Sequence, residues 1–542
     1  MPDIVLVNPR FPSAYWGLEH ALGFLGSRAL LPPASLPLLA ALTPSSCQIT
    51  LMDENVQPID FDRCARADIV GLTGMFVQRE RMREILVELK RQGVFTVVGG
   101  AWITVQEADF EGLVDVVFVG EADEAWPRFL EDWAAGSHQQ RYEQSERTDL
   151  MKLPAPRLDL LPMKQYQFGG IQISRGCPFT CEFCDIIVVF GRKPRIKGSD
   201  QIIAELDDLV KAGKTTIFIV DDNLIGNKKA IKPILRDIIA WQEKHGFAVT
   251  FAAEASIDLA EDAELMKLMV DANIDKVFVG IETPNEESLQ ETKKIQNLTD
   301  ARGTMLEKVH RIQQVGMEVW SGMIVGFDSD DAGVFDLQRD FIQESHIVNT
   351  MINQLVAIPR TPLFARLDQE GRLDHSPDAL LRWTNVIPRQ LTPTQLYEGC
   401  ASLMRDLYTP EAYFGRLDYL YLKQGLRPAV ARARYLQSRP IRRLISNLRL
   451  LAESLTIMSL LMLRVPHAEL RREYRNRVVR AAVSRRNAAV LQLYALKCAL
   501  HFHSYMMAQE MISKTKKAVQ TPPVDKPQLG APDVRQPLQA SG

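Results

Sequence analysis

Between residue 3 and about residue 133, five short and almost continuously apolar runs alternate with segments of helical periodicity. Each run ends in a glycine, a proline or an acidic residue, and the runs are DIVLVNP, QITLMDE, DIVGLTG, FTVVGG and VVFVGE. Strands that are apolar on both faces and joined by helices are typical of a parallel sheet covered by helices. The pattern predicts a Rossmann-like domain over residues 1–135, with turn residues at the strand ends where such sheets bind ligands.

A polar stretch over residues 136–149, followed by LPAPRLDLLP, has charges, prolines and no hydrophobic period. We interpret residues 136–165 as a linker, because this stretch offers little apolar surface to pack. A second series of apolar runs begins at residue 170, and its runs are GIQIS, TIFIVDD, VTFAAEA, KVFVGIET, EVWSGMIVG and NTMINQLVAI. Six strand–helix units are fewer than the eight of a closed barrel, so we expect a partial (β/α)6 barrel over residues 166–390.

From residue 391 the pattern is helical and increasingly basic, with arginines placed among Leu, Ile and Val. We expect a helical C-terminal domain over residues 391–513. A tail rich in Pro, Gln and Lys over residues 514–542 is expected to be disordered. The longest apolar stretch, residues 455–465, is too short to span a bilayer as a helix. The chain is thus an α/β protein of several units, as its 542 residues also suggest.

The composition of the chain bears on its partners, its cellular location and the roles of its cysteines. The net charge of −3 gives the whole molecule no general attraction to nucleic acid, and we expect no nucleic-acid partner. No basic region precedes the first apolar run, so we see no secretory signal and expect a cytoplasmic protein. Four of the seven cysteines are widely scattered and are interpreted as small buried apolar residues: Cys47, Cys64, Cys400 and Cys498.

The other three cysteines lie within eight residues of the segment ISRGCPFTCEFCDI, directly after the first barrel strand. Cys177, Cys181 and Cys184 have the spacing C-x3-C-x2-C, which lets one loop wrap three thiolates around a four-iron–four-sulfur cluster. A closed electron-transfer cluster takes four cysteines, so one iron would stay open to another ligand. A structural zinc site would need a fourth ligand, and no histidine occurs between His138 and His245.

This motif, with Phe183 before its last cysteine, resembles the signature of the radical S-adenosylmethionine (SAM) superfamily. The resemblance implies that the open iron is chelated by SAM, which the reduced cluster cleaves to give a radical. It also implies an external electron donor such as flavodoxin or ferredoxin. The protein would orient SAM and the substrate and keep water from the radical.

Polar residues at the ends of the next barrel strands are further candidates for holding SAM. Asp221, Asp222 and Asn223 follow the second strand, where many members of the superfamily have a glycine-rich segment. Their alternative role is to cap the next helix. Glu254 and Glu282 end the third and fourth strands and are expected to accept hydrogen bonds from SAM, although either carboxylate could instead form a structural ion pair.

The N-terminal domain resembles the cobalamin-binding domain of class B radical SAM methyltransferases. Its strand ends carry GLTG, GGAWIT and GEADE, with Trp102 where many relatives have His. The candidate cobalamin-binding residues are Gly71, Thr73, Gly99, Gly100, Gly120 and Glu121. The region MDENVQPID lacks the histidine that binds cobalt in the classical mutases. The open alternative is a nucleotide-binding or purely structural domain, although no GxGxxG motif follows the first strand.

Four segments resemble the branch that contains the hopanoid methylases and the bacteriochlorophyll side-chain methylases: CDIIVVFGRKPRIKG, VDDNLIGNKKAIKPIL, GIETPNEESL and AIPRTPLFARL. The resemblance implies transfer of a methyl group to an unactivated carbon of a hydrophobic polycyclic molecule, a hopanoid-like lipid or a tetrapyrrole. The alternatives are a cobalamin-binding enzyme that catalyses a rearrangement or cyclisation, and an iron–sulfur electron carrier or sensor. The basic C-terminal helices are either an ordinary solvated cap or a peripheral membrane contact. No side chain is assigned as an acid, a base or a nucleophile.

Overall fold

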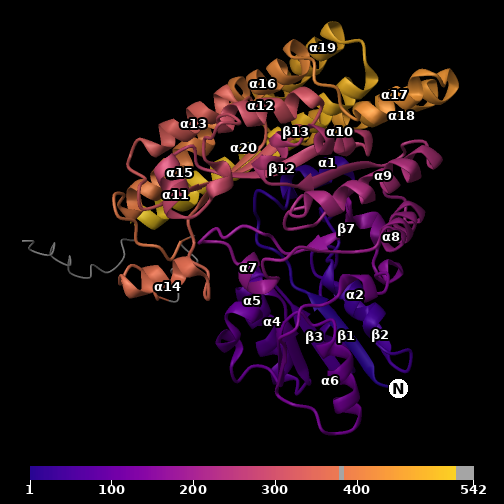
Figure 1. The fold of residues 1–542 in the computed structure, drawn as a ribbon, viewed down its shortest axis with the longest axis vertical. Helices are drawn as coiled ribbons and strands as arrows, with labels where there is room; N and C mark the ends of the chain where they lie inside the picture. Colours follow the sequence, from indigo (N-terminus) through magenta and orange to yellow (C-terminus); the bar gives the residue numbers. More distant parts are fainter. Residues whose placement is uncertain (377–383, 521–542) are drawn as a thin grey trace, which may run out of the picture.

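The computed structural model describes residues 1–376 and 384–520, which form three parts that follow one another along the chain (Figure 1). The first part is a six-stranded parallel sheet with the strand order β2-β1-β3-β4-β5-β6. Its strands are β1 (Asp3–Asn8), β2 (Gln48–Asp53), β3 (Ile69–Thr73), β4 (Thr96–Gly99), β5 (Val116–Gly120) and β6 (Arg141–Gln144). The strand order reverses between β1 and β3, where open α/β sheets bind ligands.

Helices cover both faces of this sheet, as the apolar strands predict. They are α2 (Ser35–Leu42), α3 (Phe61–Ala65), α4 (Arg79–Arg91), α5 (Ala101–Val105) and α6 (Ala125–Ala134), whereas α1 (Glu19–Leu25) packs against the C-terminal helices. Val5 and Val7 of β1 pack with α3, α4 and α5, whereas Ile4 and Leu6 pack with α2 and α6. Alternate side chains of one strand therefore belong to two hydrophobic cores, one on each face of the sheet. The predicted Rossmann-like fold is confirmed.

Strand β6 lies within the stretch that we expected to be a linker. Arg141 and Glu143 are exposed, whereas Tyr142 and Gln144 are buried, which is the period of a half-buried edge strand. The Tyr142 hydroxyl donates to Asp132 at 2.7 Å, and its ring stacks on Phe118 of β5. The expectation failed because only one apolar side chain marks this strand, too few to stand out among its polar neighbours.

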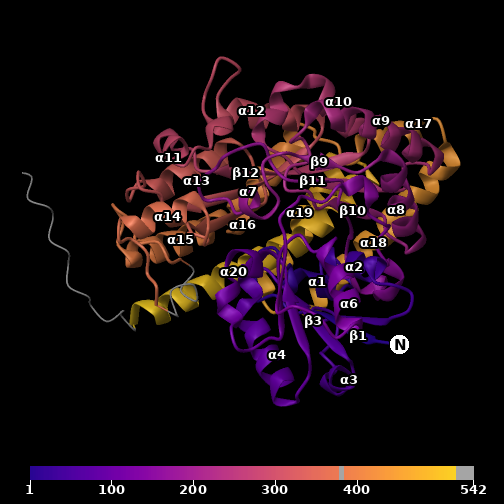
Figure 2. The ribbon, with the colours of Figure 1, turned by 60° about the horizontal axis from the view of Figure 1, so that its bottom comes forward.

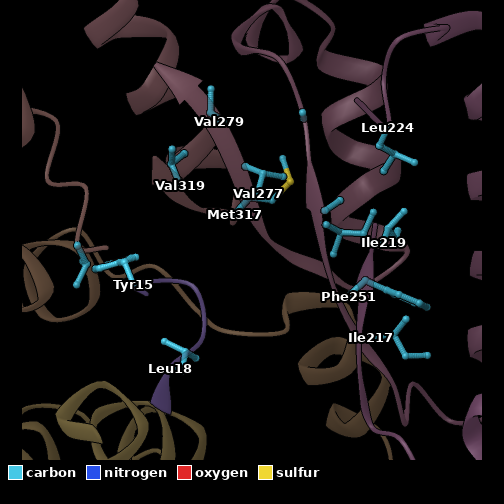
Figure 3. Close-up of a cluster of buried hydrophobic side chains, with 14 of the residues drawn as sticks. Tyr15, Leu18, Ile217, Ile219, Leu224, Phe251, Val277, Val279, Met317 and Val319 are labelled. Carbon is cyan, nitrogen blue, oxygen red and sulfur yellow. The ribbon is translucent and has the colours of Figure 1, made fainter. Parts of the chain in front are cut away.

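The second part is the partial barrel, whose six parallel strands have the order β14-β13-β12-β11-β10-β7. They are β7 (Gly169–Ile171), β10 (Thr216–Ile219), β11 (Thr250–Glu254), β12 (Ile274–Glu282), β13 (Glu318–Val325) and β14 (Thr350–Gln354). All six predicted runs form these strands, so the partial (β/α)6 barrel is confirmed. Figure 3 shows one set of alternating side chains from three of them: Ile217, Ile219, Phe251, Val277 and Val279.

Helices follow the barrel strands along the chain, and most of them pack on the outward side chains of the strands. They are α7 (Ile186–Val189), α8 (Ser199–Lys211), α9 (Lys228–Lys244), α10 (Ala263–Asp271), α11 (Glu286–Glu291), α12 (Met305–Val315), α13 (Val334–Glu344) and α14 (Pro362–Gln369). Helix α12 shows how the sequence sets such boundaries. Thr304 and Glu307 form a reciprocal capping box at its start, and Gly316 with φ 116° ends it in the left-handed region.

The third part is a layer of helices, as predicted. They are α15 (Pro393–Leu407), α16 (Pro410–Asp418), a π-helical turn (Tyr419–Lys423), α17 (Val430–Gln437), α18 (Pro440–Arg464), α19 (Ala468–Ser484) and α20 (Ala488–Gln520). Figure 2 shows the long α20 passing between the barrel and the first sheet. It continues to Gln520, beyond the predicted start of the disordered tail at residue 514. The remainder of that predicted tail, residues 521–542, lies outside the described residues.

A buried ion pair fastens α20 to the barrel. The Lys497 ammonium group of α20 donates to the Glu318 carboxylate at the start of β13 and to Asn349 Oδ1 at 2.6 Å, and the Lys497 and Glu318 side chains are each 1% exposed. The Tyr421 hydroxyl also donates to Glu318, at 2.5 Å. Burial lowers the pKa of Lys497. Burial opposes the charge of Glu318 as well, but the nearby Lys497 and Lys276 keep its pKa below the usual value.

We predict that Lys497→Met lowers the free energy of unfolding by about 3–5 kcal/mol, because it leaves the Glu318 carboxylate buried without its main partner. The double variant Lys497→Met with Glu318→Gln should recover part of this loss. Chemical denaturation of the cluster-free chain measures both effects. The exposed pair Arg236–Glu264 is the control, and its Arg236→Met variant should cost less than about 1 kcal/mol. Equal losses at the two sites would contradict the assigned role of Lys497.

Candidate functional site

The three neighbouring cysteines lie on a loop between two very short strands. Strands β8 (Ser174–Arg175) and β9 (Arg195–Ile196) pair antiparallel, and the loop between them contains all three thiols and then helix α7. Gly176 has φ 95°, and a Cβ atom there would stand 2.9 Å from the Gly191 carbonyl oxygen. The hairpin closes tightly at its base for this reason, and the loop projects beyond the carboxyl ends of the barrel strands.

The thiol groups have different environments. Cys181 is buried, whereas Cys177 and Cys184 are partly exposed. Burial raises the pKa of Cys177 and of Cys184, so without a metal they remain protonated thiols. Because a metal ligand must be a thiolate, loading the site would release protons.

Polar groups from the barrel surround the sulfur atoms. The Asn223 amide nitrogen lies 3.8 Å from Cys177 Sγ, and the Gln296 amide nitrogen lies 3.6 Å from Cys181 Sγ. Burial opposes the positive charge of Lys294, but Glu282 and Cys181 keep its pKa above the usual value. Donors of this kind stabilise the negative charge of a thiolate-bound cluster and tune its potential.

Within residues 1–376 and 384–520, no group of three His, Cys, Asp or Glu side chains is arranged to hold a single metal ion. A zinc ion would draw its ligands to about 2.0–2.3 Å from one centre. An iron–sulfur cluster instead attaches each cysteine to a separate iron. Three thiols on one projecting loop therefore fit a cluster.

Two neighbouring carboxylates connect the end of β10 to the cysteine loop. Asp221 accepts from the backbone N–H of Ile173 and from the Ser174 hydroxyl, both at 2.7 Å. Asp222 accepts from the backbone N–H of Gly176 at 2.9 Å. Burial raises the pKa of Asp221 to about 7 and that of Asp222 to about 6. Asn223, the third predicted residue here, is buried and also donates to the Ser256 hydroxyl at 3.1 Å.

Glu254, at the end of β11, has no hydrogen-bond or ion-pair partner for its carboxylate among the residues that the structure describes. Burial, followed by the charges of Asp222 and Asp221, raises its pKa to about 8. Its side chain is partly exposed to a cavity that Asp222 also lines. An unpaired carboxylate in such a place costs folding free energy, and it is typical of a position that a ligand completes.

Glu282 has a different environment. Its carboxylate accepts from the Lys294 ammonium group at 2.7 Å, and its backbone has φ 64°, in the left-handed region. Lys294 is close to Cys181 and Cys184, and neither Glu282 nor Lys294 lines the cavity. Of the two predicted glutamates, Glu254 thus faces open space and Glu282 forms an ion pair.

A single cavity of about 2290 Å³ extends from the first sheet through the interior of the barrel to the C-terminal helices. On the barrel side it is lined by the inward-facing residues of successive strands: Gly170, Gln172, Thr216, Phe218, Val220, Asp222, Thr250, Ala252, Glu254, Lys276, Phe278 and Trp320. This lining begins at Thr216, the first residue of β10, and continues to Asp222, beyond the last strand residue Ile219. The cavity therefore runs the length of a barrel strand.

The predicted residues of the first sheet border the same cavity. Gly71, Thr73, Gly99, Gly100 and Gly120 all line it, at the carboxyl ends of β3, β4 and β5. Gly100 has φ 107°, and a Cβ atom there would stand 2.7 Å from Thr73 Oγ1. This glycine allows two strand ends to meet closely beneath the cavity floor.

The cavity is not lined by Trp102, Gly322 or Gly326. Trp102 is buried and donates from Nε1 to Asp109 at 2.8 Å, so it packs inside its own domain. Gly322 and Gly326 pack against protein side chains: Phe278 for Gly322, and Leu396 with Leu355 for Gly326.

The carboxylate of Glu121 is 1% exposed and holds two arginines, although the residue borders the cavity. It accepts from Arg175 Nη1 and from Arg195 Nη1, each at 2.9 Å. Arg175 also donates to Asp123 at 2.5 Å. Since Arg175 comes two residues before Cys177, this buried ion cluster joins the first sheet to the base of the cysteine loop.

The sequence did not predict several residues of the candidate site: Arg175, Asp123, Lys294, Gln296 and Ser256. Arg175 adjoins the cysteine motif, but its partners lie more than fifty residues earlier in the chain. Gln296 lies 115 residues from the cysteine that it contacts. No local sequence pattern predicts contacts between residues so far apart in the chain.

Two protein-family models match successive parts of the chain. Residues 171–339 match the Radical SAM superfamily, and residues 361–517 match a domain of unknown function, DUF4070. Among curated proteins, an uncharacterized methyltransferase of Synechocystis is 38% identical over 78% of this chain and 79% of its own. The hopanoid C-2 methylase of Rhodopseudomonas palustris is 33% identical over 77% of this chain and 79% of its own.

Solved structures share the fold. The cobalamin-dependent SAM radical enzyme OxsB, with aqua-cobalamin and SAM bound, covers 96% of this chain and 81% of its own, with a TM-score of 0.59 at 15% identity. The radical SAM methyltransferase TsrM of Kitasatospora setae covers 70% of this chain and 78% of its own, with a TM-score of 0.56 at 16% identity. At these identities the likeness concerns the fold.

We predict that Glu254→Gln raises the melting temperature of the cluster-free protein, and more so at about pH 8 than at about pH 5. The folded-state pKa of about 8 lies above the usual value, so the folded protein holds an extra proton between the two. The free energy of unfolding from this group therefore falls as the pH rises through that window. Glutamine does not titrate, and the gain should reach a few degrees.

The exposed Glu398 provides the control, because Glu398→Gln should leave the melting temperature unchanged at both pH values. If Glu254→Gln lowered the melting temperature at about pH 8, the carboxylate would be structural and its assignment to a ligand would be wrong.

We predict that Glu121→Gln lowers the free energy of unfolding by up to about 3–5 kcal/mol, because Arg175 and Arg195 lose a buried partner. Glu143→Gln on the neighbouring β6 is the matched control, since its exposed pair with Arg141 should contribute less than about 1 kcal/mol. Denaturant unfolding compares the two variants. Unchanged stability together with weaker cobalamin binding would instead assign Glu121 to the cofactor.

Proposed function

The chain belongs to the radical SAM methyltransferases, the family that includes the hopanoid C-2 methylase, and we propose that it methylates an unactivated carbon of a hydrophobic polycyclic substrate with the aid of cobalamin. The observation that carries this proposal is the single cavity that connects the ends of β3, β4 and β5 with the barrel interior. A methyl donor held at one end and a radical generated at the other could then act on one substrate between them.

The residues of the cysteine loop fit a [4Fe–4S] cluster with one open iron. Cys177, Cys181 and Cys184 would hold three irons, and the Asn223 and Gln296 amides lie within reach of sulfur. When bound, the cluster and SAM supply a radical that can remove hydrogen from an unactivated carbon, and cobalamin supplies the methyl group. Lys294 offsets the negative charge of the thiolates in this buried place.

Asp222 and Glu254 fit a ligand with hydrogen-bond donors, such as the ammonium group or the ribose hydroxyls of SAM. Both carboxylates line the cavity, and Glu254 lacks a partner within the described part of the chain. Their raised pKa values mean that a positively charged ligand would be bound more tightly as they ionise.

The first sheet offers a place for cobalamin at the point where its strand order reverses. Large apolar side chains from the loops after β1 and β3 line the cavity there and are exposed: Phe11, Met75 and Val77. A flat, largely apolar cofactor would cover these side chains. None of the nine histidines is among the described residues that line the cavity, so the cobalt ion would take no imidazole from this chain.

The interior of the barrel suits a hydrophobic polycyclic substrate. Phe218, Val220, Ala252, Phe278 and Trp320 supply an apolar wall. Such a wall excludes water from a reactive radical. A lining that follows β10 from its first residue to beyond its last accommodates an extended, rigid molecule.

This chemistry requires an electron donor and access to a hydrophobic substrate. We infer a cytoplasmic enzyme that receives electrons from a flavodoxin or ferredoxin and meets its substrate by peripheral contact with a membrane. A rearrangement catalyst would use the same cluster, whereas an electron carrier would not cleave SAM.

The test supplies SAM labelled in its methyl group to a host that expresses the gene, and follows the label into lipids and tetrapyrroles. We expect the label on a carbon of one such product. Cys181→Ala should abolish the cluster absorbance, the formation of 5′-deoxyadenosine and the labelling together, whereas Cys47→Ala, remote from the site, should change none of them. Formation of 5′-deoxyadenosine without labelled product would favour the rearrangement, and an intact cluster without 5′-deoxyadenosine would overturn the radical mechanism.

A further inference from the structure

Helix α18 has apolar side chains on two opposite sides. On its inner side Ile457 and Leu461 are buried, and α20 packs against this side. On its outer side, large apolar side chains are exposed to solvent: Ile441, Leu444, Ile445, Leu448, Leu451, Leu455 and Leu463. Leu444, Leu448 and Leu455 are 60%, 58% and 69% exposed. A helix that packs only on one side normally has polar residues on the other.

These outer residues form one continuous stripe. Apart from the adjacent Leu444 and Ile445, the positions from 441 to 455 follow one another at spacings of three and four, so they lie along a single side of the helix. Val479 and Val483 of the following helix α19 are also exposed, at 56% and 78%. A contiguous apolar surface of this kind marks an interaction site. We call the seven exposed residues of α18 the outer stripe.

The surroundings of the outer stripe are strongly basic. Residues 427–487 contain fifteen arginines and three glutamates, whereas the whole chain has a net charge of −3. Only four of these arginines form an ion pair among the described residues: Arg434, Arg449, Arg477 and Arg480. The other eleven have no ion-pair partner there, and Arg443, Arg472 and Arg475 are examples. Apolar side chains flanked by unpaired basic residues complement a bilayer with anionic head groups.

Within the described residues, α18 is also the one helix that is long and apolar enough to cross a membrane by length and composition. Crossing would remove Ile457 and Leu461 from α20 and would place Arg449 and Glu453, which pair at 2.9 Å, in hydrocarbon. A helix that keeps its inner contacts and exposes an apolar outer side lies in the plane of the interface.

We infer that the outer stripe docks the protein on an anionic bilayer and that the cavity beneath α18 takes up the substrate from that bilayer. Inner residues of α18, including Ser446, Leu450 and Ile457, line the same cavity that reaches Glu254 at the barrel mouth. A hydrophobic molecule could therefore pass from the membrane beneath the helix without crossing water. The uptake step rests on the proposed function, whereas the docking step does not.

A second copy of the chain is a less suitable occupant of the outer stripe. In a two-fold interface each surface meets itself, so two arginine-rich surfaces would be brought together. Repulsion between these like charges opposes such a contact. A bilayer with anionic lipids offers the opposite charge together with an apolar interior.

The test uses the full-length, cluster-loaded chain with sedimenting vesicles of phosphatidylcholine alone or with phosphatidylglycerol, in the absence of substrate. We expect binding only to the anionic vesicles, weakening with added salt. The variant Leu444→Gln/Leu448→Gln/Leu455→Gln should lower the bound fraction at least tenfold. All three side chains are exposed, so the variant should retain its fold, which its melting temperature and cluster absorbance verify.

The control variant carries Val87→Gln and Leu337→Gln, which are 52% and 45% exposed on α4 and α13, and it should bind vesicles as the original chain does. Equal binding by both variants, or no binding by the original chain, would overturn the docking surface. A dimer in solution that the α18 substitutions dissociate would assign the stripe to a second copy instead. Vesicle binding is measured in the absence of substrate and of methyl transfer. If the protein binds vesicles but does not methylate, that result would count against the proposed function alone.

Discussion

The buried ion cluster of Arg175 with Glu121 and Asp123 determines how the two α/β parts face each other. It lies between the end of β5 and the base of the cysteine loop, so it fixes the loop relative to the first sheet. Helix α7 continues the same contact, because Val189 is buried in the core that contains Val98 and Trp102. An iron–sulfur cluster on the cysteine loop and a cofactor on the first sheet would have to reach the same substrate. They could not do so if the distance between the loop and the sheet were free to vary. Precise placement is worth large factors in rate.

The open side of the partial barrel creates the second constraint. Six strands cannot close on themselves, and the gap must be covered by something other than a seventh strand. The N-terminal segment and α20 cover it together. Tyr15 meets Tyr408 through their hydroxyls at 2.6 Å, and His503 of α20 contacts the Tyr15 carbonyl at 3.0 Å. Polar groups this deeply buried specify one arrangement, because any other would leave them without partners. The cover thus fixes the shape of the cavity.

Every strand of the two sheets except β6 could be predicted because it is a compact apolar run, and the cysteine loop could be predicted because its spacing is local. Residues that act through distant contacts could not. Glu121 and Glu254 both follow apolar strands, yet one holds two arginines and the other faces open space. Only the three-dimensional arrangement separates them, since Arg175 and Arg195 lie 54 and 74 residues from Glu121. Strand β6 was missed because one buried tyrosine is a weak pattern.

Two features of the molecule cost stability without serving its packing, and they lie at opposite ends of one cavity. Glu254 keeps a half-buried carboxylate unpaired, and α18 keeps a row of Leu and Ile in contact with solvent. Neither is needed by the fold, because a neutral residue at the first place and polar residues at the second would fold as well or better. Each is explained if something outside the chain completes it: a ligand with hydrogen-bond donors at the barrel mouth and an apolar, anionic surface at α18. The cavity between them is then the route that connects the two.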